Sequence, residues 1–180
     1  MPPMILYALR HGQTNYNLLG LCNDDPRRDV HLTDRGRAQA QAAARELQDT
    51  PIERIFTSRL PRTLETARAI NRYHGVEIEP RPDLDDIRSG FDGRPVEAYF
   101  AATGRDRLHL RASGGESLLD YRRRVLGFLD WLRDQPFGCV LLVVHEETLR
   151  VLHTQFHRLP PERMEGLSFG NCEIQRFLLD

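Results

Sequence analysis

The sequence predicts an α/β protein, a three-layer α/β/α sandwich with a mostly parallel central sheet. Two short apolar runs, residues 5–9 and 140–144, end abruptly at polar residues, as buried strands of a parallel sheet do. Segments with helical periodicity alternate with short strand-like segments, which is typical of α/β folds. With 180 residues, the chain can bury its own core, so we expect one domain over residues 1–180.

The first half of the chain alternates strands and helices. Thr33 is a residue type that caps helix N-termini, Pro61 suits the first turn of a helix, and Gly75 is a typical stop. The predicted elements are a strand over 5–9, a loop over the pocket at 15–30, a helix over 33–47, a strand over 55–57, a helix over 61–73 and an edge strand over 76–79.

The second half continues the same alternation. Ser117 and Asp120 have the spacing of a capping box, and the apolar residues behind them recur on one helical face up to Pro136. The predicted elements are a loop over 81–93, a helix over 95–103, a helix over 118–135, a strand over 140–144, a helix over 148–156 and a strand over 174–179.

Composition restricts the possible partners and the compartment. The formal net charge is only −1, which argues against nucleic-acid or membrane-surface binding, and the basic residues are all arginine. Cys22, Cys139 and Cys172 are odd in number and widely spaced, as expected for free thiols in a reducing compartment. No apolar run has the length of a membrane span or the flanks of a leader, so we expect a cytoplasmic protein. The sequence indicates no oligomeric state.

Two histidines and an arginine follow the two apolar strands. Arg10 and His11 come directly after the first, and His145 after the second. Because ligands bind outside the carboxyl ends of strands in open α/β sheets, these side chains should face one pocket. An arginine can bind two phosphate oxygens at once, and a histidine ring nitrogen can attack phosphorus. The chain has no lysine, Walker loop or carboxylate cluster, so arginine and histidine would neutralise a phosphate there without metal or cofactor.

A second pair of histidines, His153 and His157, lies four residues apart on a predicted helix. That spacing can bind a metal ion, but no third ligand has a suitable spacing. We therefore expect a solvated helix face and no metal site.

The segment Leu9-Arg10-His11-Gly12-Gln13-Thr14, followed by Asn17, resembles the signature of the histidine phosphatase superfamily, whose fold is that of phosphoglycerate mutase. Other segments match the family's motifs in the family's order, so the resemblance covers almost the whole chain. They lie at residues 32–40, 57–67, 84–93, 115–124 and 144–150.

The resemblance implies a role for each matching residue. His11 would be the nucleophile and become transiently phosphorylated. The groups around the phosphoryl group would be Arg10, Arg62 and His145, with Thr14 and Asn17 as hydrogen-bonding partners and Ser58 at the neighbouring strand end.

The resemblance offers two candidates for the proton donor. Asp86 lies four residues before Gly90, where the family places its donor, although most members have Glu there. Glu146 directly follows His145, and a carboxylate at that position is the donor in the acid-phosphatase branch. We favour Asp86 because its surrounding loop matches the family pattern.

The expected function is a metal-independent phosphatase that hydrolyses a small phosphorylated metabolite through a phosphohistidine. The alternatives are a cofactor-dependent phosphoglycerate mutase and a non-catalytic phospho-ligand-binding member of the family. Only 20 residues lie between Gly93 and Gly114, whereas the mutases that this chain resembles carry a longer insertion there, so hydrolysis is favoured. Neither segment 18–30 nor 89–110 has a motif that identifies the substrate.

Overall fold

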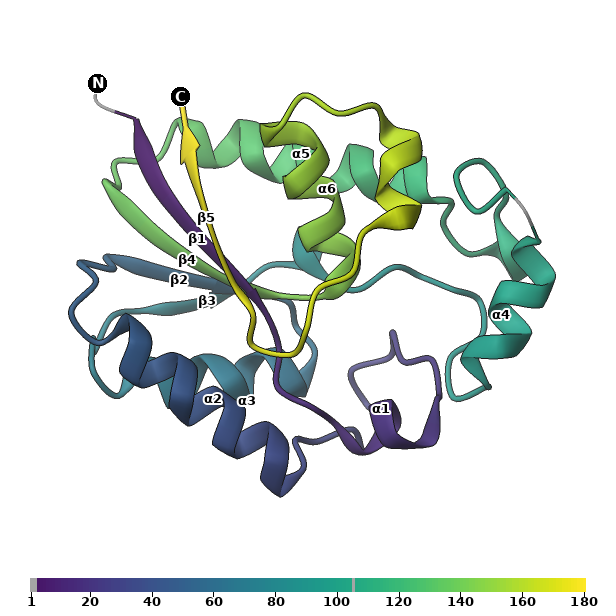
Figure 1. Ribbon diagram of the computed structural model, residues 1–180, viewed down its shortest axis with the longest axis horizontal. Coiled ribbons are helices and arrows are strands. Elements are labelled where there is room, and N and C mark those ends of the chain that lie inside the picture. The colour runs from purple at the N-terminus through teal and green to yellow at the C-terminus, as the bar shows by residue number, and fades with distance from the viewer. Residues whose placement is uncertain (1–2, 105) are drawn as a thin grey trace.

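A five-stranded sheet forms the centre of the protein (Figure 1). The computed structural model describes residues 3–104 and 106–180. The strand order is β3-β2-β4-β1-β5, and every neighbouring pair is parallel except β1 and β5. The strands are β1 (Met4–Arg10), β2 (Arg54–Thr57), β3 (Ile78–Pro80), β4 (Cys139–Val144) and β5 (Ile174–Leu179).

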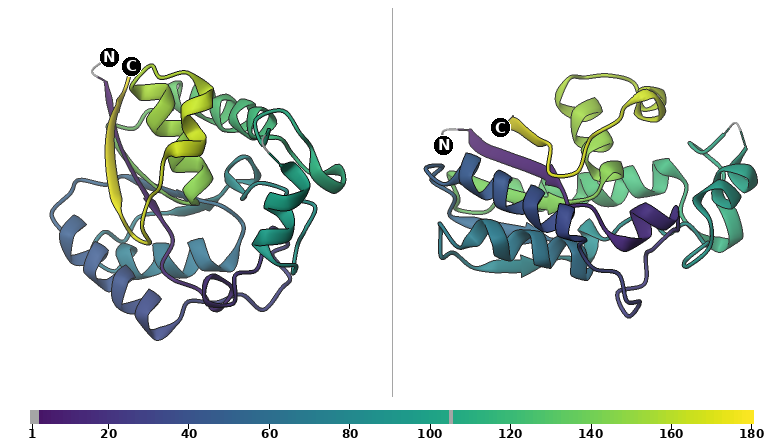
Figure 2. Two further views of the ribbon diagram at one scale, coloured as in Figure 1. Left: turned by 45° about the vertical axis from the view of Figure 1, so that its right-hand side comes forward. Right: turned by 60° about the horizontal axis from the view of Figure 1, so that its bottom comes forward.

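Helices cover both faces of this sheet (Figures 1 and 2). Helices α2 (Asp34–Leu47) and α3 (Pro61–Asn71) pack on one face, and α5 (Leu118–Arg133) and α6 (Glu146–Phe156) pack on the other. Successive residues of β4 point alternately into these two apolar cores, and all six are buried. The predicted three-layer sandwich with a mostly parallel sheet is therefore confirmed.

The register of the central strands determines where the site forms. The last residue of β1, Arg10, pairs with Val144, the last residue of β4. The two chains consequently leave the sheet side by side, and His11 and His145 begin the segments that follow. Helices α1 (Asn15–Leu19) and α4 (Val96–Thr103) lie beyond this carboxyl edge (Figure 1).

The predicted caps explain the N-termini of α2 and α5. Thr33 Oγ1 accepts a hydrogen bond from the Gly36 N–H, and Ser117 and Asp120 form the predicted reciprocal capping box. The loop prediction for 15–30 is wrong at its start, because Thr14 and Asn17 cap each other and Gly20 ends the turn in the left-handed region. A helix of five residues is too short to show periodicity.

The chain after β1 crosses the first turn of α2 at very short range. A Cβ atom on Gly36 would lie 2.1 Å from the Gln13 carbonyl oxygen, and one on Gly12 would lie 2.5 Å from the Gly36 oxygen. Only glycine therefore fits at either position. This contact fixes the backbone that carries His11 against α2.

Two further sequence expectations can be compared with the structure. Cys22, Cys139 and Cys172 are all free thiols, as predicted. Over the described residues, none of the helices combines the length and apolar character that crossing a lipid bilayer requires.

Candidate active site

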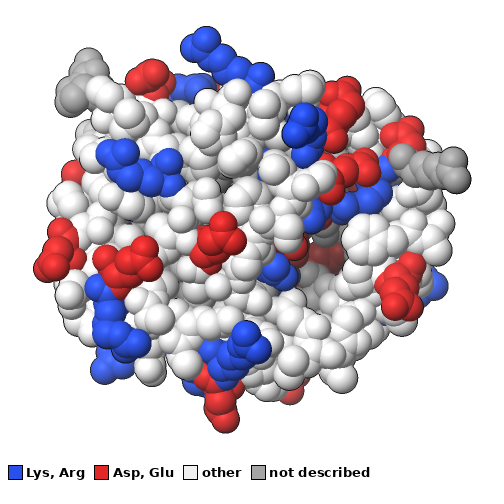
Figure 3. Space-filling model, viewed as in Figure 1, with Lys and Arg blue, Asp and Glu red and all other residues white. Residues whose placement is uncertain are grey.

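A cavity of about 280 Å³ opens at the carboxyl ends of β1 and β4. Figure 3 shows it as a hollow on the face seen in Figure 1, with charged side chains of both signs around it. The predicted site residues that line it are Arg10, His11, Thr14, Asn17, Arg62, Asp86 and Glu146. The structure thus brings together residues from four separate segments of the chain.

His11 lies at the base of this cavity with only 3% of its surface exposed. Its Nδ1 is 2.8 Å from the Gly12 carbonyl oxygen, so Nδ1 carries the ring proton. Its Nε2 accepts a hydrogen bond from Arg62 Nε at 3.1 Å and therefore holds the lone pair. Burial, followed by the charges of Arg62, His145 and Arg10, holds the pKa of His11 well below 6.5. The ring is neutral at physiological pH.

Two guanidinium groups flank the His11 ring. Arg62, in the first turn of α3, donates from Nη1 to Asn23 Oδ1 and from Nη2 to the Asn23 carbonyl at 3.0 Å. Arg10 donates from Nη1 to the Phe169 carbonyl at 2.9 Å, and its buried Nε has no partner among the described residues. Arg10 therefore lines the cavity with a guanidinium group that the described residues do not fully satisfy.

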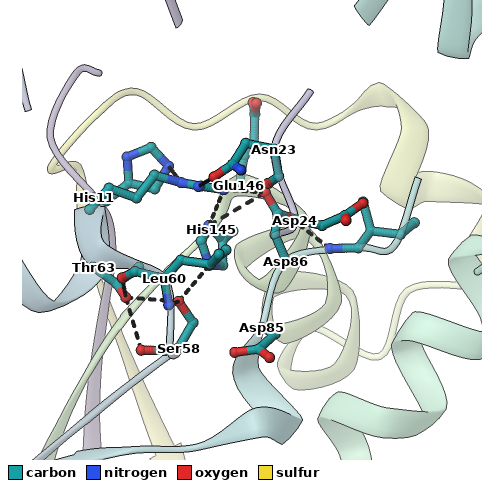
Figure 4. Close-up of polar contacts among 12 residues, drawn as sticks. His11, Asn23, Asp24, Ser58, Leu60, Thr63, Asp85, Asp86, His145 and Glu146 are labelled. Carbon is teal, nitrogen blue, oxygen red and sulfur yellow. Dashed lines mark hydrogen bonds and ion pairs between the residues drawn. The ribbon is translucent and has the colours of Figure 1, made fainter. Parts of the chain in front are cut away.

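His145 lies between Asp86 and Ser58 in the contact network, with its ring centroid 5.4 Å from that of His11 (Figure 4). Its Nε2 is 2.9 Å from Ser58 Oγ, which is 2.7 Å from Thr63 Oγ1. The Thr63 hydroxyl donates to the carbonyls of Leu60 and Ser58, so it accepts the proton of the Ser58 hydroxyl.

We assign the tautomer of His145 from this network. With the Thr63 hydroxyl donating to the two carbonyls, the Ser58 proton goes to Thr63, the Ser58 hydroxyl accepts from His145, and the ring proton is placed on Nε2. Nδ1 is therefore the nitrogen that faces Arg62 and Asp86, each 3.4 Å away. Burial and the charges of Arg62, Arg10 and Arg124 lower the pKa of His145 well below 6.5.

Asp86 reaches the centre of the cluster from the segment after a 3₁₀ turn over Pro82–Leu84. Its Oδ2 lies 3.0 Å from Arg62 Nη2, and its Oδ1 accepts from the Ile87 N–H. Arg124 holds this segment by donating to the carbonyls of residues 82, 83, 85 and 86, and Glu116 orients Arg124. Asp85 instead points away and pairs with Arg59 (Figure 4).

Glu146 also lines the cavity, but its carboxylate is bound on several sides. Its Oε2 lies 3.3 Å from Arg10, and its Oε1 accepts from the Phe169 N–H and the Ser168 hydroxyl. Arg150, one helical turn later, is 3.5 Å away. Glu146 therefore ties Arg10 to the 168–169 turn.

The remaining predicted residues occupy two different environments. Thr14 and Asn17 line the cavity while capping each other across the first turn of α1. Ser58 is fully buried behind His145 and does not line the cavity. Sequence reasoning missed Asn23, because a loop asparagine has no pattern that marks its contact with Arg62.

Sequence reasoning also missed a cluster of charged side chains that lines the cavity. Glu147 pairs with Arg107 at 2.8 Å and with Arg150 at 3.0 Å. The position of Glu147, two residues after His145, could have suggested that it lies at the site. Across residues 3–104 and 106–180, no three His, Cys, Asp or Glu side chains come together as metal ligands.

The chain is similar in sequence and structure to several known proteins. The family model of the histidine phosphatase superfamily (branch 1) matches residues 6–180. The "Probable phosphoglycerate mutase GpmB" of Yersinia enterocolitica is 29% identical over 180 residues, covering 95% of this chain and 83% of that protein. The solved alpha-ribazole phosphatase from Shigella flexneri is similar with a TM-score of 0.87 and 26% identity, covering 96% and 89% of the two chains. A mycobacterial glucosyl-3-phosphoglycerate phosphatase gives a TM-score of 0.81 and 27% identity, covering 97% and 89%.

Proposed function

This chain belongs to the histidine phosphatase superfamily, and from that premise we propose that it is a metal-independent phosphatase acting on a small-molecule phosphate monoester. The reaction would proceed through a phosphohistidine at His11. The observation that carries the proposal is the His11 ring, which is neutral, has its lone pair on Nε2 and lies between two guanidinium groups.

In the first step, His11 Nε2 attacks phosphorus and the bond to the leaving oxygen breaks. The guanidinium groups of Arg10 and Arg62 would hold the non-bridging oxygens as charge develops on them. Thr14 and Asn17 would add hydrogen bonds from the α1 side. A proton passes from Asp86 to the leaving alkoxide.

In the second step, Asp86 accepts a proton from a water molecule, which attacks the phosphohistidine. The P–N bond breaks, inorganic phosphate leaves and His11 returns to its neutral form. Since its Nε2–H is bound by Ser58, His145 would exchange protons only through Nδ1, on the side of the phosphoryl group.

Asp86 suits the donor role better than Glu146. Asp86 lines the cavity within 3.4 Å of both Arg62 and His145, which surround the nucleophile. The Glu146 carboxylate is occupied by Arg10 and two donors of the 168–169 turn. We assign Glu146 to positioning Arg10.

Two features favour hydrolysis over phosphoryl transfer between positions of one substrate. Proteins similar in structure include an alpha-ribazole phosphatase and a glucosyl-3-phosphoglycerate phosphatase. Among the described residues between Gly93 and Gly114, the helical elements are α4 and part of a 3₁₀ turn, so this 20-residue connection is short for a segment that retains an intermediate.

Rapid quenching with a ³²P-labelled ester tests the proposal. We expect acid-labile label on the wild-type chain, none on His11→Ala, and phosphate release that is unchanged by EDTA. Loss of activity with EDTA, or full turnover by His11→Ala, would contradict the mechanism.

The second candidate is a cofactor-dependent phosphoglycerate mutase, as the name of the Yersinia relative suggests. Dependence on a bisphosphoglycerate primer, with interconversion and no phosphate release, would support it. Phosphate binding without turnover, unaffected by Asp86→Ala and Glu146→Ala, would instead indicate a non-catalytic phospho-ligand-binding protein.

A further inference from the structure

The outer half of the cavity has two walls of opposite character. The wall built by the 16–30 segment and α4 is largely apolar and aromatic, and includes Leu21, Val30, Val96, Tyr99 and Phe100. A second group of lining residues is charged and consists of Arg107, Glu147 and Arg150, and it meets the first where Arg107 packs on the rings of Tyr99 and Phe100. We call these last three residues the mouth triad. Because the phosphoryl group would lie at His11, the alcohol half of the substrate must fit against these two groups of residues.

The mouth triad is incompletely hydrogen-bonded. Glu147 Oε1 accepts from Arg107 Nη2 at 2.8 Å and from Arg150 Nη1 at 3.0 Å. The second oxygen, Oε2, and the Nε of each arginine are buried without a partner among the described residues. Buried polar atoms are normally satisfied, so one acceptor and two donors of this cluster would gain a partner if a ligand group entered it. All three side chains are at most 15% exposed, which makes them a built feature rather than a solvated surface.

The charge of the triad indicates what kind of ligand fits. Two arginines without Glu147 would suit a second phosphate or a carboxylate. The Glu147 carboxylate cancels one of those charges and presents an oxygen that would repel an anion. A hydroxyl group, by contrast, donates and accepts, and so matches an unpaired carboxylate oxygen beside unpaired N–H groups.

The apolar wall and the cavity volume restrict the ligand further. Arg107 lies 4.8 Å from the ring centroid of Phe100 and 5.4 Å from that of Tyr99, so one side chain orients both rings and the triad. A volume of about 280 Å³ is near the lower limit of small-molecule pockets. Building on the proposed function, we infer that the leaving group is a small uncharged polyol or sugar, bound through hydroxyls by the mouth triad and packed through its C–H face on α4.

Two matched substrate pairs test this inference. Glycerol 3-phosphate has a hydroxymethyl group where 3-phosphoglycerate has a carboxylate. Glucose 6-phosphate has a hydroxyl group where glucose 1,6-bisphosphate has a second phosphate. In at least one pair, the wild-type enzyme should have a tenfold or higher kcat/KM for the ester whose alcohol half is uncharged. Glu147→Gln should reduce that ratio at least tenfold, because it removes the repelling charge. The control Glu46→Gln, an exposed glutamate on α2, should leave the ratio unchanged.

The ratio is measured within one preparation, so it does not depend on the fraction of folded enzyme. A wild-type preference for the anionic members, or a ratio that Glu147→Gln does not change, would overturn the inference. Hydrolysis of p-nitrophenyl phosphate without hydrolysis of any of the four esters would overturn the substrate class but not the proposed function. If the enzyme hydrolysed none of these esters and formed no phosphoenzyme, the proposed function itself would be overturned.

Discussion

Replacing Ser58 by alanine should impair the enzyme even though Ser58 lies outside the cavity. In the wild type, Ser58 Oγ accepts from the Leu60 N–H at 3.2 Å and from His145 Nε2 at 2.9 Å. Ser58→Ala leaves both buried donors without a partner. Since alanine cannot fix the proton on Nε2, His145 can also adopt the tautomer with the proton on Nδ1.

The size of the effect follows from these two contacts. A buried donor without a partner costs about 1–3 kcal/mol, so the free energy of unfolding should decrease by about 2–6 kcal/mol. If the His145 share of that loss is felt in the transition state, kcat falls about 5- to 150-fold. Because Ser58 does not contact the cavity, KM should change less than kcat.

Urea unfolding gives the stability change, and steady-state kinetics over pH give kcat and KM. Thr63→Ala removes the acceptor of the Ser58 proton and should lower kcat in the same direction. Thr63→Ser keeps that hydroxyl and is the matched control, with kcat close to wild type.

A double-mutant cycle decides whether Ser58 acts through His145. In a His145→Asn background, Ser58→Ala should have little further effect on kcat. An equal loss of kcat in both backgrounds would refute the tautomer argument, as would an unchanged pH profile.

Three further predictions concern pH, the proton donor and the backbone crossing. Because burial and Arg62 lower the pKa of both site histidines below 6.5, the unfolded chain binds up to two more protons than the folded chain below that pH. The free energy of unfolding should therefore be unaffected by these histidines above pH 6.5 and should decrease on acidification by up to about 2.7 kcal/mol per pH unit. His145→Asn should remove about half of this slope, measured by urea titrations at pH 7.5 and 5.5. Asp86→Asn should lower kcat about 10²–10⁴-fold for alkyl esters and much less for p-nitrophenyl phosphate, whereas Glu146→Gln should raise KM equally for both; the reverse pattern would make Glu146 the donor. Gly36→Ala places a Cβ 2.1 Å from the Gln13 oxygen and should destabilise the fold by about 1–3 kcal/mol in thermal or urea unfolding, while Gly127→Ala, at an exposed glycine of α5 where a Cβ would meet no neighbour, serves to separate this clash from a general glycine effect.

The elements predicted correctly are those with a strong local pattern. The continuous apolar run of β4 and the capping residues Thr33 and Ser117 determine their elements from neighbouring residues alone. The α1 helix was not predicted, because its five residues depend on one reciprocal cap rather than on an apolar stripe. Local patterns are therefore sufficient for the layers of this fold but not for its shortest helix.

The residues of the candidate site likewise fall into those that local patterns predict and those that they do not. Arg10, His11 and His145 could be expected to meet because they end neighbouring strands. The mouth triad could not be predicted, since Arg107 reaches Glu147 only through tertiary packing of a segment with no regular pattern. The Arg124 contacts that hold the Asp86 segment likewise join residues about 40 positions apart.

The two halves of the cavity are supported by different parts of the chain. The base is built on the end of β1 and the first turn of α3, and the backbone that carries it packs closely against α2 at the Gly12–Gly36 crossing. The opposite rim is closed by main-chain bonds between the 20–22 and 93–96 segments, which pair with each other and not with the sheet. Substrate choice in this architecture can therefore diverge without altering the phosphoryl chemistry. We expect that transplanting both rim segments together from a relative would transfer its preference among alcohols, while transplanting either one alone would break their pairing.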